Sequence, residues 1–182
     1  MSKITVKELE APTGFDLKIA AGETLDLNSQ GTVILPTIPS NKMPTGSVLQ
    51  VVSTHSTATM TTTSGSMVGT GLIATITPSS SSNKILVTIA GGRTDVGSAH
   101  APKASLRSSI NGASYTEILA NIEERHYSGT NYWGDAHALT YLYSPNTTNS
   151  VAIQPYFMTN TSTHYYNTSS CSIGLTLMEV KG

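Results

Sequence analysis

The stretch Leu106-Arg107-Ser108-Ser109-Ile110-Asn111-Gly112-Ala113-Ser114-Tyr115-Thr116-Glu117-Ile118-Leu119 decides the fold class. Its centre, Asn111-Gly112, is a residue pair that two-residue hairpin turns prefer, because such turns need a positive φ at their central positions. The stretch therefore predicts two antiparallel strands joined by a tight turn. Apolar residues flank the pair on both sides: Leu106, Ile110, Tyr115, Ile118 and Leu119.

Runs of strand character recur along the chain, separated by Gly, Pro, Asn and Ser. Thr, Val, Ile and Tyr suit a pleated sheet, and helix formers are scarce. About eight strands between Pro44 and Gly182 favour an all-β fold, an antiparallel β-sandwich of jelly-roll type. The apolar members of the other runs are Val48, Leu49, Val51 and Val52; Leu72, Ile73 and Ile76; Ile85, Leu86, Val87 and Ile89, before Gly91-Gly92; Leu139, Tyr141 and Tyr143; Val151, Ile153 and Tyr156; and Ile173, Leu175, Leu177 and Val180.

One segment leaves two alternatives open. Residues 115–125 hold Ile118, Leu119 and Ile122 at the spacing of a helix face, so this segment is the chain's helix candidate. A bent strand accounts for the same residues equally well.

The first 42 residues differ from the rest, because they form short apolar pieces broken by Gly or Pro. Four such pieces are too small to enclose a core of their own. We therefore expect residues 1–42 to form a trimerisation or attachment segment, a short β stalk, ahead of a β-sandwich head at residues 43–182. The alternative is packing onto the head of the same subunit. The turn-rich stretch Pro36–Pro44 is interpreted as a linker. The candidate contact residues are Ile4, Val6, Phe15, Leu17, Ile19, Leu25 and Leu27.

Composition excludes several classes of protein. The chain has 182 residues, 12% of them charged, a net charge of −1 and 51 serines and threonines. Without a basic excess it is not expected to bind nucleic acid, and no apolar run is long enough for insertion into a membrane. A lone cysteine, Cys171, forms no internal disulfide, and the start lacks the hydrophobic run of a signal peptide. We expect synthesis and folding in a cytoplasm.

The aromatic residues are unevenly distributed, since only Phe15 precedes residue 115. Residues 127–135 combine flat rings with small polar groups, the mixture found in adaptable recognition loops. Sugar faces stack on such rings, while amides and carboxylates bind hydroxyls. The alternative for Tyr141, Tyr143 and Tyr156 is that they fill one face of the sandwich. The candidate glycan contacts are Tyr127, Asn131, Tyr132, Trp133 and Asp135.

Signals for catalysis are weak. Asp135 and His137 would share a strand face, and Glu124 or His126 could complete a metal site, but structural histidines explain the pattern equally well. Glu123 with Asp135 is the least unfavourable acid pair for glycoside hydrolysis; a solvated cluster at residues 123–125 is the better interpretation. No phosphate-binding Gly loop is present. We therefore predict no enzyme activity, no metal and no cofactor.

Five stretches, in this order, resemble virion structural proteins of tailed bacteriophages, especially marine and cyanobacterial ones. The resemblance covers about residues 43–182 and carries no catalytic residues. It implies a β-sandwich head, a homotrimer and a place on the particle surface, as in tail fibres, head fibres or decoration proteins. The stretches are Met43-Pro44-Thr45-Gly46-Ser47-Val48-Leu49-Gln50-Val51-Val52, Thr70-Gly71-Leu72-Ile73-Ala74-Thr75-Ile76-Thr77-Pro78-Ser79-Ser80, Asn83-Lys84-Ile85-Leu86-Val87, Tyr141-Leu142-Tyr143-Ser144-Pro145-Asn146-Thr147 and Leu175-Thr176-Leu177-Met178-Glu179-Val180.

Three functions are therefore compared. The first is a homotrimeric, tail-fibre-like virion appendage made in the host cytoplasm, attached to the tail or capsid by its N-terminal segment, with a head that contacts host-surface carbohydrate. The second is a capsid decoration or cement protein. The third, a glycan-degrading enzyme, suffers from the small number of carboxylates.

Overall fold

The computed structural model describes residues 39–96, 103–123, 135–159, 163–168 and 171–182. These residues form an all-β fold of two antiparallel sheets, which confirms the predicted sandwich-like class. Besides the 3-10 helix η1 (Ser40–Lys42), the elements are β1 (Val48–Ser56), β2 (Met60–Thr62), β3 (Val68–Gly69), β4 (Ala74–Ile76), β5 (Lys84–Val96), β6 (Lys103–Ile110), β7 (Thr116–Glu123), β8 (Asp135–Tyr143), β9 (Val151–Met158), β10 (His164–Asn167) and β11 (Ile173–Val180).

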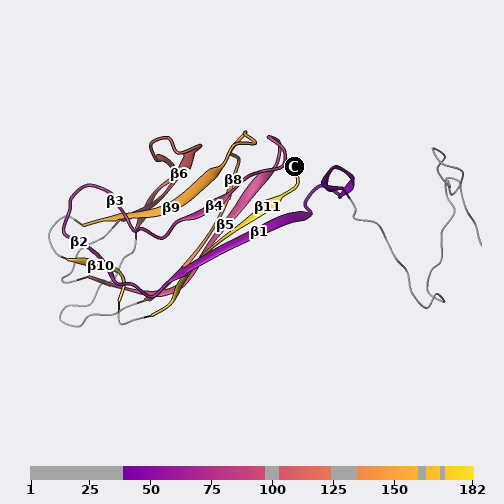
Figure 1. Ribbon diagram of the computed structural model, residues 1–182. Coiled ribbons are helices and arrows are strands. Elements are labelled where there is room, and N and C mark those ends of the chain that lie inside the picture. The colour runs from indigo at the N-terminus through magenta and orange to yellow at the C-terminus, as the bar shows by residue number, and fades with distance from the viewer. Residues whose placement is uncertain (1–38, 97–102, 124–134, 160–162, 169–170) are drawn as a thin grey trace, which may run out of the picture. The chain divides into compact units, whose positions relative to one another are not determined.

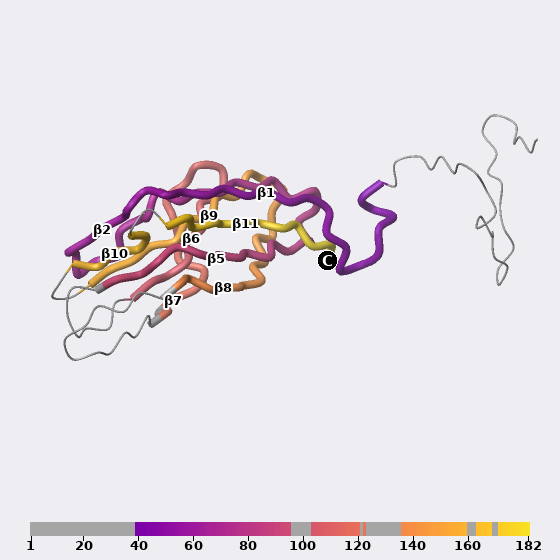
Figure 2. Tube along the Cα trace, turned by 90° about the horizontal axis from the view of Figure 1, so that it is seen from below, coloured from indigo at the N-terminus to yellow at the C-terminus, as the bar shows by residue number. Residues whose placement is uncertain are grey.

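The larger sheet, here called sheet 1, has the order β1-β11-β5-β8, and Figure 2 shows these four strands side by side. The long strand β5 pairs with β11 along its first part and with β10 at its end. The short strand β2 pairs with β10 as β1 pairs with β11. Sheet 1 is therefore four strands wide. β1 and β2 follow one another in the first strand position, and β11 and β10 do so in the second.

The smaller sheet, sheet 2, is built on β9 (Figure 1). The strands β3 and β4 pair with successive parts of one edge of β9, and β6 and then β7 follow on its other edge. The short strands β2, β3 and β10 were not expected from the sequence, because pieces of two to four residues are held by their neighbours and carry little local signal.

The core lies between the sheets, and strand alternation supplies its residues. In sheet 1, every second residue of β11, and of β5 up to Ile89, is buried, while the residues between them are less buried. This period of two is the pattern of a sheet with one face in the core and one in solvent. The main buried apolar residues are Leu72, Ile76, Ile85, Val87, Ile89, Leu106, Val151, Ile153, Phe157, Ile173, Leu175 and Leu177.

The predicted hairpin is present. Asn111 and Gly112 have φ angles of 53° and 76°, and the Ala113 amide donates to the Ile110 carbonyl across 3.1 Å. These positive angles are what a type I′ turn requires. Residues 115–125, for which the sequence allowed a helix or a bent strand, contain the strand β7. The pairing of β7 with β6 shifts register twice, between Ala104 and Arg107. β7 is therefore an irregular strand and not a helix.

The expectation that a strand stops at Gly91-Gly92 is wrong, because β5 continues through both residues to Val96. Gly91 and Gly92 adopt φ angles of +85° and +72°, and the pairing of β5 with β8 shifts register between Gly91 and Thr94. The Gly92 amide donates to the Ser172 carbonyl across 2.7 Å. The glycines bend the strand without ending it, since only glycine adopts these angles at low cost.

Beside this bend, Asn167 joins the short strands of sheet 1. Its side-chain amide nitrogen donates to the carbonyls of Ser56, Ala58 and Cys171, at 3.3, 3.2 and 2.8 Å. Asn167 is fully buried. The Asn167 side chain thus donates to carbonyls in two connections, the one between β1 and β2 and the one between β10 and β11.

The chain divides into a unit of residues 1–38 and a compact unit of residues 39–182. The end of the predicted linker, up to Pro44, belongs to the second unit. There the Lys181 ammonium donates to the carbonyls of Asn41 and Met43, which fastens η1 to the end of β11. No helix among the described residues is long and apolar enough to span a bilayer.

Candidate functional site

Most of the predicted glycan contacts fall on residues that the structure does not describe. Tyr127, Asn131, Tyr132 and Trp133 lie outside the described residues. Asp135 is the first residue of β8, and its backbone pairs with Thr94 of β5. The glycan-binding role of these residues stays a prediction.

The predicted attachment residues also lie outside the described part of the chain. They belong to the unit of residues 1–38. Their role in attachment and trimerisation stays a prediction. They are Ile4, Val6, Phe15, Leu17, Ile19, Leu25 and Leu27.

The strand tyrosines divide into two groups. Tyr141 and Tyr143 of β8 pack against the core, and the Tyr143 hydroxyl lies 3.1 Å from the Ser108 hydroxyl of sheet 2. Tyr156 lies on the side of β9 opposite the buried Phe157, and the Arg107 guanidinium stands 4.5 Å from its ring centre. The alternative that all three fill one interior face is right for Tyr141 and Tyr143 and wrong for Tyr156.

His137 is a buried residue of the sandwich. Its Nε2 atom lies 2.6 Å from the Thr94 hydroxyl and 2.8 Å from the Tyr166 carbonyl. Its ring stacks on Tyr166 with 4.1 Å between centres. No cluster of three potential metal ligands occurs among the described residues. The contacts of His137 fit the structural interpretation of this residue better than the metal-binding one.

Three carboxylates have described side chains, and each has polar partners within the fold. Asp95 accepts a hydrogen bond from Arg93 Nε at 3.2 Å, and Glu117 lies 3.9 Å from Arg107. Glu179 is the third, described below. The side chains of Glu123 and Asp135, the candidate acid pair, lie outside the described residues.

Glu179 of β11 is 1% exposed and accepts hydrogen bonds from four donors. They are Asn83 Nδ2 at 2.5 Å, Gln50 Nε2 at 2.6 Å, and the amide and hydroxyl of Ser79 at 2.6 and 2.8 Å. Burial raises the pKa of this carboxyl, but the hydrogen bonds outweigh burial and hold its pKa below the ordinary value. Glu179 therefore joins β11 to β1 and to the turn before β5 as a buried carboxylate.

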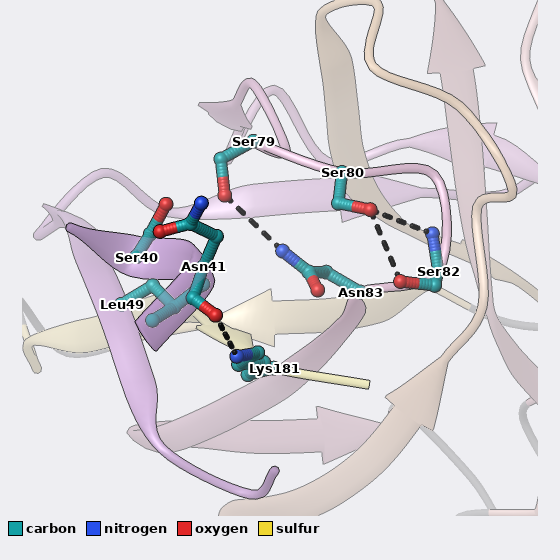
Figure 3. Close-up of a pocket in the computed structure, with 8 residues that line it drawn as sticks. All are labelled: Ser40, Asn41, Leu49, Ser79, Ser80, Ser82, Asn83 and Lys181. Atoms are coloured by element: carbon teal, nitrogen blue, oxygen red, sulfur yellow. Dashed lines mark hydrogen bonds between the residues drawn. The ribbon is translucent and has the colours of Figure 1, made fainter. Parts of the chain in front are cut away.

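A cavity of about 200 Å³ opens beside Ser79 and Asn83, two of the residues that donate to Glu179, and Figure 3 shows its lining. Asn83 points from one wall toward the Ser79 hydroxyl, 3.1 Å away, while Lys181 points toward the Asn41 carbonyl, 3.0 Å away. Polar groups of the lining thus bind one another. The lining residues are Ser40, Asn41, Leu49, Ser79, Ser80, Ser82, Asn83 and Lys181.

The outer face of sheet 1 is a regular surface. Residues that pair across four strands lie on the same face, so the outer residues form rows. The apolar row has its most exposed side chains at its two ends, 55% for Val51 and 47% for Leu142. None of the three rows contains Asp, Glu, Lys or Arg. The rows are Val51-Met178-Leu86-Leu142, Ser53-Thr176-Thr88-Thr140 and His55-Gly174-Ala90-Ala138.

This face was not among the predicted sites, although a signal for it exists in the sequence. Residues 43–83 contain no Asp, Glu, Lys or Arg, and they include β1. Four of the exposed large apolar residues fall within this range: Val48, Val51, Val68 and Ile73. The run indicates an uncharged surface, but it does not identify the rows, because these are set by pairing with β11, β5 and β8.

Comparison with solved structures gives distant similarities. No family model matches the chain, and no curated protein matches it. A chain in a structure of infectious bursal disease virus, Gx strain, is similar over 81% of this chain and 37% of its own length, with 10% identity and a TM-score of 0.40. A chain from the Gt strain is similar over 81% and 42%, with 10% identity and a TM-score of 0.35. This chain thus spans less than half of either viral chain.

Proposed function

We propose that this chain is a structural protein of a virion, a homotrimeric, tail-fibre-like appendage that acts by assembly and binding and not by catalysis. Residues 1–42 attach it to the tail or capsid, and the head of residues 43–182 contacts host-surface carbohydrate through the segment 127–135. The sequence resemblance to phage virion proteins motivates the particle. The structural observation that supports assembly is the set of three charge-free rows on the outer face of sheet 1. The next row on that face, Val48-Val180-Lys84, carries one charge.

The chemistry of these rows favours protein contact. Four strands spaced about 4.8 Å apart, over the five residues that the rows span, cover roughly 330 Å² in flat projection. The rows would therefore form part of a standard interface, in which each partner buries ~800 Å² of accessible surface. The three rows would place no formal charge in the contact, so burying them carries none of the desolvation cost of an unpaired ion.

The particle role is tested by finding the protein on purified virions and counting its copies by quantitative mass spectrometry. A handful of copies at the tail supports the appendage. Hundreds of copies on the head would replace it with the second candidate, a capsid decoration protein, which the same charge-free rows favour. Absence from the particle would refute both roles.

Glycan binding is tested on an array with the intact protein and the variant Trp133→Ala. Binding by the intact protein and its loss in the variant support the recognition role, because an aromatic ring provides the stacking surface for a sugar. The matched control is Tyr156→Ala, which removes an aromatic ring from sheet 2. A flat response of the intact protein would remove the receptor role and leave the structural role in place.

A depolymerase assay tests the absence of catalysis. The intact protein and the variants Glu123→Gln and Asp135→Asn are incubated with host polysaccharide, and reducing ends are counted. No turnover by the intact protein supports a structural protein. Turnover that disappears in either variant would establish a glycosidase instead.

A further inference from the structure

The two edge strands of sheet 1 are long and nearly uncharged. β1 and β8 each contain nine residues, and within the described residues each pairs with one neighbour only, β11 and β5 respectively. β1 contains no charged residue and no proline, and β8 contains one charge, on its first residue Asp135. Proteins normally protect free edges with charges, prolines or covering segments, since an open edge pairs with other strands.

The directions of these edges are compatible with pairing between copies. All neighbours in sheet 1 are antiparallel, so an even number of four strands leaves β1 and β8 running in opposite directions. A second copy rotated about an axis parallel to the strands would place its β8 beside β1 of the first copy, again antiparallel. Such a contact joins two different surfaces, which is the kind of contact that a closed ring of three requires.

The outer rows give the register of this pairing. The row Val51-Met178-Leu86-Leu142 begins on one edge strand and ends on the other. Its inner members are partly covered by neighbours on both sides, while Val51 and Leu142 are 55% and 47% exposed at the edges. Setting Leu142 of one copy beside Val51 of the next would give both residues a cross-strand apolar neighbour.

We propose that β8 of one copy pairs antiparallel with β1 of the next, with Leu142 opposite Val51, so that sheet 1 continues from subunit to subunit around the trimer. This inference rests on the proposed homotrimer and identifies the surfaces that form it. The occupant of each edge is a second copy of this chain. Its uncharged edge complements an uncharged edge, whereas a charged partner strand would bury charges without opposite charges to meet them.

Cysteine cross-linking tests the register. Within one subunit, Val51 and Leu142 are three strand spacings apart, about 14 Å, which is beyond the Cα separation that a disulfide spans. In a Cys171→Ser background, the double variant Val51→Cys/Leu142→Cys is oxidised and run on a non-reducing gel. We expect a ladder that ends at three subunits. Each single variant should stay uncrosslinked.

The matched control is His55→Cys/Leu142→Cys, in which the β1 partner lies four residues from the proposed register, about 14 Å along the strand. It should not cross-link. A covalent dimer from Val51→Cys alone would mean that β1 pairs with β1 of another copy, which overturns the proposal. A covalent dimer from Leu142→Cys alone would mean that β8 pairs with β8 of another copy, which also overturns the proposal.

A charge exchange tests the same contact without oxidation. Val51→Lys and Leu142→Lys should each convert the trimer to monomers in analytical ultracentrifugation, because each places an unpaired charge in the interface between the two edge strands. The double variant Val51→Lys/Leu142→Glu should restore the trimer. Ile73→Lys, at a 42% exposed apolar residue on the loop before β4, is the control and should remain trimeric.

These outcomes separate the inference from the proposed function. A trimer that forms without cross-links and survives both lysine variants would overturn the edge pairing while leaving the homotrimer intact. A wild-type protein that sediments as a monomer would overturn the homotrimer and the edge pairing together. Circular dichroism of each variant confirms that β structure persists, so a loss of assembly is not mistaken for unfolding.

Discussion

The side chain of Asn83 donates a hydrogen bond of 2.5 Å to the carboxylate of Glu179, almost one hundred residues further along the chain. Asn83 stands just before β5, and Glu179 lies near the end of β11. Gln50 of β1 and Ser79 donate to the same carboxylate. A buried charge is tolerated here because every described partner is a hydrogen-bond donor.

Removing this charge should destabilise the fold. Glu179→Gln replaces one acceptor oxygen with a donating amide NH2 group that faces other donors, which leaves buried groups unsatisfied. We expect a loss of about 2–4 kcal/mol in the free energy of unfolding, measured with urea. The control is Glu117→Gln, at a carboxylate that is 42% exposed and 3.9 Å from Arg107, where we expect a change below about 0.5 kcal/mol. Equal effects of the two substitutions would contradict the role of Glu179.

The same carboxylate predicts a pH dependence of stability. Its pKa in the folded protein lies below 4.5, the ordinary value for a glutamic acid side chain. The unfolded chain therefore binds a proton at higher pH than the folded chain does. The stabilisation from Glu179 is fully present above pH 4.5 and is lost as the pH falls through the lower folded pKa. Urea unfolding from pH 7 to pH 3 should show this loss. The Glu179→Gln variant should lack that part of the slope, and an unchanged slope would contradict the assignment.

The bend of β5 should not tolerate side chains. A Cβ atom on Gly91 would stand 2.5 Å from the Ser172 carbonyl oxygen, in addition to the strain of its positive φ. We expect Gly91→Ala to lower the free energy of unfolding by more than about 2 kcal/mol. The unfavourable φ accounts for ~1 kcal/mol of this loss, and the clash with the backbone accounts for the rest. Gly71→Ala is the control, because its φ of +77° is similar and nothing lies within 4 Å of the added atom. Thermal unfolding measures both, and similar melting temperatures would contradict the predicted clash.

Asn167 should be sensitive to the loss of its amide. In Asn167→Ala, three backbone carbonyls lose their shared donor, and we expect about 2–4 kcal/mol of destabilisation in urea unfolding. Asn167→Asp should cost more, since a carboxylate would face those carbonyls. The control, Asn149→Ala, alters an exposed loop residue and should change stability by less than about 0.5 kcal/mol. An Asp variant more stable than the Ala variant would contradict the donor role.

The sequence by itself determined the local features of this protein. The apolar runs at β5, β9 and β11 predicted strands at these positions, because their residue types suit a pleated sheet. Asn111-Gly112 predicted the hairpin, since that pair accepts the positive φ angles of its turn. The low charge argued against a nucleic-acid-binding protein.

Tertiary structure decided what depends on distant neighbours. Gly91-Gly92 was expected as a turn but bends a strand, because β11 and β8 hold the backbone on both sides. Neither the carbonyls bound by Asn167 nor the donors around Glu179 are local in sequence, and the strand order of sheet 1 brings them together. The outer rows follow from the same pairing. Local patterns fix which face a residue takes, whereas strand order and register fix its neighbours, and these are properties of the folded chain.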